Sequence, residues 1–212
     1  LSTSTTVSGL PASLRSSITY KTTQVKGIRM PHCPMKFRLV RGRLPSAPRI
    51  LDIGCGNGSP SITKRWFPNC SYAGADIQRY NLTEADDAAM DEFFPLGADC
   101  SGYDKIPDRS YDLVLLNHVV EHMADHVPVL TALCGKLKPG GYIWIAFPSP
   151  RSLALPSSTD ETLQFCDDPT HVYVPDVREI ANILLANEVN VLHAGQSREG
   201  FWTTAVDTLR LC

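Results

Sequence analysis

Short apolar runs alternate with helical patterns from residue 49 onward. Tyr111–Asn117 carries only Leu and Val between its opening Tyr-Asp and its closing Asn, as expected of a strand covered on both faces. The predicted strands are Arg49–Ile53, Ser71–Ile77, Leu96–Cys100, Tyr111–Asn117 and Tyr142–Phe147, and a closing antiparallel pair at Val189–His193 and Phe201–Val206. This alternation predicts an α/β fold, doubly wound, with a mostly parallel seven-stranded sheet and helices on both faces.

Three segments between these strands have helical character. They are Glu84–Phe93, Val119–Leu137 and Pro175–Asn187. The second is expected to stop at Lys138-Pro139-Gly140-Gly141, because Pro and Gly end helices. The third has Pro at its start, which suits the first helical turn.

The segment before the main domain is basic and rich in Ser and Thr. Nine Lys and Arg and no acid precede Asp52, a pattern compatible with a nucleic-acid contact, an anionic substrate, a transit peptide or a solvated arm. We favour the solvated arm, because the segment has no clear helical amphipathicity. We assign 1–46 to a lead-in and 47–212 to one domain, with a lid loop at 148–171 because loops of this length are often functional.

Composition is that of a globular protein. Of the 212 residues 43% are hydrophobic and 20% charged, which argues against disorder. No apolar run has the length of a bilayer span, so a soluble protein is expected. The seven cysteines are odd in number and form no C-x-x-C pair, which favours reduced thiols and a cytoplasmic location.

The most informative segment is Ile50–Gly58, an apolar strand with an acid, Asp52, followed by Gly-x-Gly-x-Gly. Alternate glycines allow a sharp turn after the strand and leave bare main chain for a ligand. In open α/β sheets, ligands bind beyond the carboxyl ends of the strands. The dinucleotide fingerprint G-x-G-x-x-G is not met, since Ser59 stands where its last glycine belongs.

The whole segment resembles motif I of class I S-adenosylmethionine-dependent methyltransferases. The resemblance continues in order through Ala73-Gly74-Ala75-Asp76, Tyr111–Asn117 and Leu137-Lys138-Pro139-Gly140-Gly141-Tyr142. It extends to the methyltransferase type 11, or ubiquinone/menaquinone-biosynthesis-like, group and implies a Rossmann-like methyltransferase fold. It also implies S-adenosyl-L-methionine as the cofactor.

The resemblance assigns residues to this cofactor. Asp52 is expected near its amino group, Asp76 at its ribose hydroxyls and Asp99, at the end of the third strand, at its adenine amino group; a helix cap is the bland alternative for Asp76. The full set of implied cofactor-binding residues is Asp52, Gly54, Cys55, Gly56, Asn57, Asp76, Ile77, Asp99 and Asn117.

A histidine-rich segment follows the fourth strand. His118-Val119-Val120-Glu121-His122 matches H-x-x-E-H, the inverted zinc-protease motif, so a zinc-dependent hydrolase using His118, Glu121 and His122 is one alternative. Similar Asn-His-x-x-Glu-His segments also occur in the methyltransferase group. There His118 and Glu121 would lie near the acceptor, and His122 and His126, on the same helix face, would be structural.

The segment Asp167–Tyr173 resembles the stretch before the next helix in small-molecule members of this group, where a histidine can face the acceptor. The resemblance makes His171 the leading candidate for a general base, since a neutral imidazole can take a hydroxyl proton near neutral pH. Its alternative role is to cap the following helix or anchor the lid. The predicted reaction is methyl transfer to an oxygen of a small-molecule or saccharide acceptor, with no metal assigned. Nucleic acid is not expected as the acceptor, since Asn117-His118-Val119-Val120 differs from the Asn/Asp-Pro-Pro-aromatic motif of base-amino methyltransferases. A catalytically silent cofactor-binding partner subunit is the second alternative.

Overall fold

A computed structural model describes residues 33–157, 164–199 and 204–211. Cys33–Cys212 forms one compact unit. The sequence predicted that the domain starts at residue 47, and this unit begins earlier, at Cys33. Helix α1 (Met35–Arg38) explains the difference, because Phe37 and the nearby Val40 are fully buried in the core. The predicted strand Phe201–Val206 starts outside the described residues.

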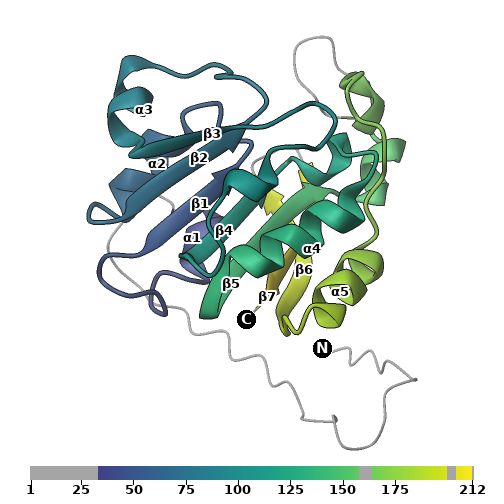
Figure 1. Cartoon of the computed structure of the whole chain (residues 1–212). Helices are drawn as coiled ribbons and strands as arrows, with labels where there is room; N and C mark the ends of the chain where they lie inside the picture. The colour runs from purple at the N-terminus through teal and green to yellow at the C-terminus, as the bar shows by residue number, and fades with distance from the viewer. Residues whose placement is uncertain (1–32, 158–163, 200–203, 212) are drawn as a thin grey trace, which may run out of the picture. The chain divides into compact units, whose positions relative to one another are not determined.

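Seven strands form one sheet in the order β3-β2-β1-β4-β5-β7-β6 (Figure 1). Strands β1 to β5 run parallel, and β7 runs antiparallel to both β5 and β6. The predicted doubly wound, mostly parallel sheet is therefore confirmed. The strands are β1 (Arg49–Ile53), β2 (Ser71–Asp76), β3 (Glu92–Pro95), β4 (Tyr111–Asn117), β5 (Leu137–Pro148), β6 (Val191–Glu199) and β7 (Thr204–Leu211).

Helices cover both faces of the sheet, and each face has its own hydrophobic core. Leu51 and Ile53 of β1 point to the face covered by α4 (His126–Lys136) and α5 (Val177–Ala186), which lie in front of the sheet in Figure 1. Ile50 points to the opposite face, where α1 and α2 (Ser59–Trp66) pack. Helix α3 (Glu84–Ala89) packs beside α2. Within the described residues the remaining elements are short 3-10 turns: η2 (Tyr103–Lys105), η3 (Val120–His122), η4 (Pro150–Ala154) and η5 (Phe165–Asp167).

The third strand lies earlier than predicted. It occupies Glu92–Pro95, and Leu96–Cys100 is not a strand, while α3 ends at Ala89 instead of Phe93. The two aromatic residues of Glu92–Pro95 favour a strand. Pro95 is tolerated there because β3 is an edge strand, where a missing N–H leaves no ladder bond broken.

The helix predicted over Val119–Leu137 is shorter. At the start of the predicted range, Val120–His122 forms a 3-10 turn instead of an α-helix. Helix α4 begins later, at His126. Pro128 explains this start, because proline fits the first turn of a helix but breaks its interior. Among the helices of the described segments, none is long and apolar enough to cross a membrane.

Candidate cofactor and acceptor site

The carboxyl ends of β1, β2 and β4 meet at one edge of the sheet. Ile53 pairs with Ala75 of β2 and with Leu116 of β4, so the next residues, Asp76 and Asn117, flank Gly54. Asn117 is exposed at this edge although the preceding four residues of β4 are buried. The sequence-predicted cofactor residues of these three strands are thus brought together.

The glycine loop is shaped by two close approaches. A Cβ atom on Gly54, whose φ is 70°, would lie 2.5 Å from Cγ2 of Val119, and one on Gly56 would lie 2.7 Å from the carbonyl oxygen of Tyr80. Any side chain at either position would therefore displace a neighbouring loop. The first approach packs the loop after β4 directly against the loop after β1.

Asp52 is buried beneath this loop, with 1% of its surface exposed. Its Oδ2 accepts hydrogen bonds from Oγ of Ser59 at 2.5 Å and from the hydroxyl of Tyr72 at 2.8 Å. Lys36 donates to Ser59 at 3.0 Å. Burial raises the pKa of Asp52, although the charge of Lys36 and the two hydrogen bonds oppose the rise. Sequence reasoning missed all three partners, and no motif marks them.

The other predicted cofactor residues differ in their surroundings. Burial raises the pKa of Asp76, opposed by the backbone N–H groups of Gln78, Ile77 and Gly56. The side chain of Ile77 is exposed. Cys55 is buried, and burial, with the charges of Asp52 and Asp76, raises the pKa of its thiol to about 12.

Two of the predicted cofactor residues, Asn57 and Asp99, lie in loops. Asn57, with a φ of 54°, accepts a hydrogen bond from the side chain of Asn81 at 2.8 Å. Asp99 is exposed and lies in the loop after β3, where its Oδ1 accepts the N–H of Ser101 at 3.1 Å. The expectation that Asp99 ends the third strand is therefore wrong, because that strand ends at Pro95. Its contact with adenine stays a prediction.

The histidine-rich segment leaves β4 through a strained residue. His118 has a φ of 58°, a left-handed conformation that costs a non-glycine residue about 1–3 kcal/mol and is typical of functional sites. Its Nδ1 lies 3.2 Å from Oε1 of Glu121, which is fully buried, while His118 is 40% exposed. His122 is exposed.

The sequence suggested that His118, His122 and His126 share one helix face. They do not, because η3 and α4 are separate elements. His126 lies elsewhere: its ring stacks on Tyr173 at 4.3 Å, and its Nε2 lies 3.1 Å from Oε1 of Glu179. The structural role expected of His126 fits these contacts.

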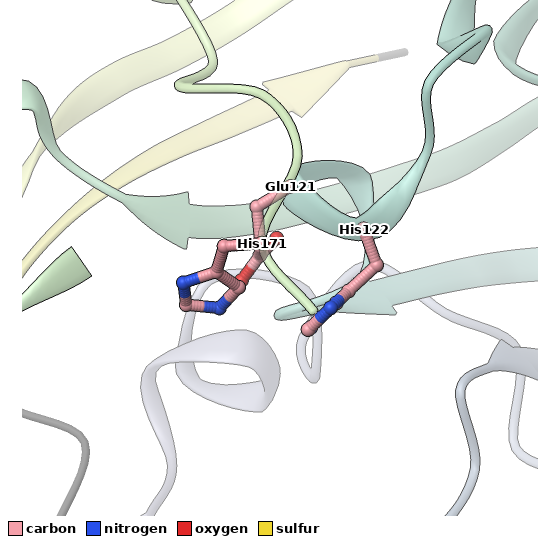
Figure 2. A group of neighbouring side chains, drawn as sticks. All are labelled: Glu121, His122 and His171. Carbon is pink, nitrogen blue, oxygen red and sulfur yellow. The ribbon is translucent and has the colours of Figure 1, made fainter. Parts of the chain in front are cut away.

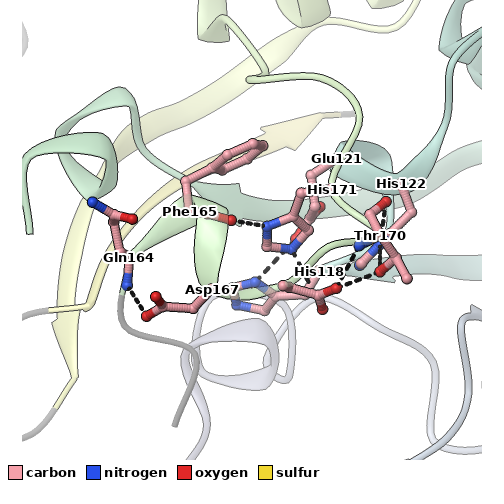
Figure 3. A network of polar contacts seen from close by, with 9 residues as sticks. His118, Glu121, His122, Gln164, Phe165, Asp167, Thr170 and His171 are labelled. Atoms are coloured by element: carbon pink, nitrogen blue, oxygen red, sulfur yellow. Dashed lines mark hydrogen bonds and ion pairs between the residues drawn. The ribbon is translucent and has the colours of Figure 1, made fainter. Parts of the chain in front are cut away.

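His171 approaches Glu121 and His122 from the segment that follows η5. The backbone N–H groups of Val172 and Tyr173 donate to the carbonyl of Glu121 at 3.0 and 3.3 Å. Nδ1 of His171 lies 2.6 Å from the carbonyl oxygen of Phe165. Figure 3 shows the resulting polar network, which joins η3 to the segment Gln164–His171. Of the predicted lid, residues 158–163 lie outside the described residues.

Comparison with known proteins identifies relatives of this architecture. A family described as "Methyltransferase domain" matches residues 31–194. Trans-aconitate 2-methyltransferase of Variovorax paradoxus is 31% identical over 119 residues, which cover 56% of this chain and 45% of that protein. Ubiquinone biosynthesis O-methyltransferase of Rhizobium rhizogenes is 29% identical over 153 residues, covering 68% of this chain and 60% of that protein. The chain spans about half the length of the curated relatives it matches.

Solved structures share the fold at lower identity. An S-adenosylmethionine-dependent methyltransferase from Mesorhizobium loti has a TM-score of 0.63 at 16% identity, covering 83% of this chain and 96% of that one. One from Archaeoglobus fulgidus has a TM-score of 0.59 at 19% identity, covering 83% and 90%. The family match covers most of the chain, and the fold agrees with it. The chain therefore belongs to the methyltransferase-domain family, within the class I S-adenosylmethionine-dependent methyltransferases.

Proposed function

We propose that this protein transfers the methyl group of S-adenosylmethionine to an oxygen atom of a small-molecule or saccharide acceptor. The observation that carries the proposal is the position of His118 and Glu121. They follow β4 directly, and Val119 between them packs against Gly54 of the glycine loop. Groups able to handle an acceptor proton thus lie next to the loop expected to hold the cofactor.

The printed names of relatives support an oxygen acceptor. They include the ubiquinone biosynthesis O-methyltransferase and a 27-O-demethylrifamycin SV methyltransferase of Amycolatopsis mediterranei, which is 32% identical over 53% of this chain. Trans-aconitate 2-methyltransferase also names a small molecule. The zinc-hydrolase alternative gains no support from any of these relatives.

The residues at the sheet edge fit the proposed cofactor. Asp76 is half-buried at the tip of β2, and among the described residues only backbone N–H groups, those of Gln78, Ile77 and Gly56, reach its carboxylate, the N–H of Gln78 at 3.5 Å. Its carboxylate therefore keeps acceptor capacity for two ribose hydroxyls. Ile77 offers an exposed apolar side chain beside it for the adenine ring. Gly54 and Gly56 would face the methionine part with main chain alone.

The proposed chemistry assigns proton transfer to His118. When bound, S-adenosylmethionine supplies a methyl group whose bond to sulfur breaks, with the electron pair kept by sulfur, as the acceptor oxygen bonds to its carbon. His118 takes the proton of the acceptor hydroxyl, because its imidazole is partly exposed. The carboxylate of Glu121, 3.2 Å from Nδ1, would stabilise the imidazolium that forms. His171, the other candidate base, is nearly buried.

Transfer of a tritiated methyl group from S-adenosylmethionine to a panel of phenols, carboxylic acids, sugars and amines tests the proposal. We expect label in hydroxyl- or carboxyl-bearing acceptors and an O-methyl product by mass spectrometry. Transfer to nitrogen or carbon alone would contradict the oxygen acceptor. Tight S-adenosylhomocysteine binding without transfer to any acceptor would instead support the silent partner subunit.

A further inference from the structure

We propose that Glu121, His122 and His171 bind one divalent first-row transition metal ion. Each residue offers one ligand atom, and these atoms all lie within 4.8 Å of one another. Figure 2 shows the three side chains converging from η3 and from the segment that carries His171. Donor atoms on a single tetrahedral ion, at about 2.0–2.2 Å each, lie about 3.3–3.6 Å apart. The widest separation in the group must therefore contract by about 1 Å on binding.

The main chain holds the two segments in this arrangement. The carbonyl of Glu121 accepts hydrogen bonds from the N–H groups of Val172 and Tyr173. These bonds fix His171, the residue before Val172, beside Glu121. The rings of His122 and His171 lie 4.8 Å apart between centroids. Ligands separated by about fifty positions in the sequence are therefore placed by backbone hydrogen bonds.

The carboxylate of Glu121 is the independent sign of a missing cation. It is fully buried, and neither of its oxygens receives a hydrogen bond from any described residue. The nearest basic atom is Nδ1 of His118, at 3.2 Å from Oε1. That imidazole is 40% exposed and makes no hydrogen bond to the carboxylate, and buried charges are normally hydrogen-bonded and paired or coordinate metals. An ion between Glu121 and the two imidazoles supplies the required positive charge.

Nδ1 of each imidazole faces a main-chain carbonyl oxygen. Nδ1 of His171 faces the carbonyl of Phe165, and Nδ1 of His122 faces the carbonyl of Thr170 at 3.3 Å. A carbonyl only accepts, so in the neutral ring Nδ1 would carry the proton and Nε2 would be the ligand atom; Nε2 of His171 also lies 3.9 Å from Oδ2 of Asp168. Metal-binding histidines typically donate their other N–H in this way.

A second layer of contacts supports His122. Oγ1 of Thr170 donates to Oδ1 of Asp168 at 2.5 Å and so accepts from Nδ1 of His122 at 2.9 Å. Such a chain fixes the orientation of the ring and makes its free nitrogen a better ligand. Figure 3 labels His122 and Thr170, which form the second of these contacts.

The donor set selects the class of ion. Two imidazoles and one carboxylate suit Zn²⁺, Mn²⁺, Co²⁺ or Fe²⁺, whereas Mg²⁺ and Ca²⁺ prefer oxygen ligands. Three protein ligands leave a position open for an oxygen of the acceptor, whose hydroxyl would lose its proton to His118 more easily when coordinated. This role for the ion rests on the proposed function, but the binding of the ion does not.

Metal binding by the tag-free, chelator-dialysed chain tests the proposal. We expect one equivalent of Zn²⁺ in competition with a chromophoric chelator, and a visible absorption band from bound Co²⁺. Glu121→Gln, His122→Ala and His171→Ala should each weaken Zn²⁺ binding by about 100-fold or more, since each removes a ligand. His193→Ala, which removes an exposed histidine of β6, should bind as the wild type does.

S-adenosylhomocysteine binding and circular dichroism of each variant separate ligand loss from misfolding. His122 is exposed, so His122→Ala keeps the test valid if a variant at a buried position fails to fold. Wild-type protein that binds no equivalent of metal, or variants that bind as tightly as wild type, would overturn the proposal. Metal binding without methyl transfer to oxygen would leave the site standing and contradict the proposed function alone.

Discussion

Asp52 and Glu121 are both almost fully buried carboxylates, and they differ in what surrounds them. Asp52, beneath the glycine loop, accepts two hydroxyl hydrogen bonds at 2.5 and 2.8 Å. Glu121, beneath the strand-four exit, accepts none from the described residues. The buried carboxylate on the cofactor side is therefore satisfied by hydroxyl groups of the protein, whereas that of Glu121 has no hydrogen-bond donor among the described residues and faces only the partly exposed imidazole of His118.

The largest expected effect concerns the acceptor side. His118→Ala should lower kcat for methyl transfer by about 100- to 10,000-fold, the range for loss of a general base. Labelled-methyl kinetics on an identified acceptor measure this effect. S-adenosylhomocysteine affinity, measured by calorimetry, should stay within about twofold, because His118 lies beyond the proposed cofactor residues. An unchanged kcat would remove His118 from the mechanism and return His171 as the candidate base.

The next effect concerns the cofactor side. Asp76→Asn should weaken S-adenosylhomocysteine binding by about 30- to 100-fold, since hydrogen bonds to a charged acceptor contribute about 1.5–3 kcal/mol. Asp108→Asn is the matched control, because Asp108 precedes β4 at the opposite edge of the sheet and pairs with Lys136. Equal affinity for Asp76→Asn and wild type would show that Asp76 does not hold the ribose.

The two buried carboxylates should also respond differently to neutral, isosteric replacement. In metal-free buffer Asp52→Asn should lower the free energy of unfolding by about 2 kcal/mol, because two charge-assisted hydrogen bonds become neutral. Glu121→Gln should leave this free energy unchanged or raise it, since a buried charge that accepts no hydrogen bond from the described residues disappears. Urea denaturation measures both. A larger loss for Glu121→Gln than for Asp52→Asn would reverse the comparison.

Asp86 extends the comparison to a third buried carboxylate. It accepts the N–H of Ser61 at 3.2 Å and the N–H and hydroxyl of Thr83 at 2.9 and 2.6 Å. Burial alone would raise the pKa of Asp86, but these hydrogen bonds outweigh burial and lower it to about 2.

Since the folded pKa lies below the unfolded value of about 3.9, Asp86 stabilises the fold above that value and loses this contribution as the pH falls towards 2. Asp86→Asn should be less stable than wild type by about 1 kcal/mol at pH 5, with a smaller gap at pH 3. Urea unfolding at both values measures the gap, and a gap that widens on acidification would contradict the assigned pKa direction.

The sheet was predictable because its signal is local. Buried parallel strands such as Tyr111–Asn117 appear as apolar runs, and the observed strand has the predicted bounds. The errors arose where a local signal was given too little weight. The two aromatic residues before Pro95 marked the edge strand, and Pro128 marked the first turn of α4.

The site was less predictable because its arrangement is not local. Motifs led to Asp52, Glu121 and His171 as candidates, but their partners come from distant segments. Lys36 lies in the segment assigned to the lead-in, and the carbonyl of Phe165 has no side-chain signature. His122 was considered structural because its proximity to His171 depends on backbone hydrogen bonds that no sequence pattern reveals.

The most direct test asks whether a metal ion lies beside Glu121 and not beside Asp52. Crystals of the full chain are grown with S-adenosylhomocysteine and Zn²⁺, and anomalous diffraction is recorded at the zinc absorption edge. The account predicts one peak within about 2.0–2.2 Å of Glu121, His122 and His171, with no peak beside Asp52. No peak between these three side chains, with the carboxylate of Glu121 hydrogen-bonded to protein or water instead, would contradict it.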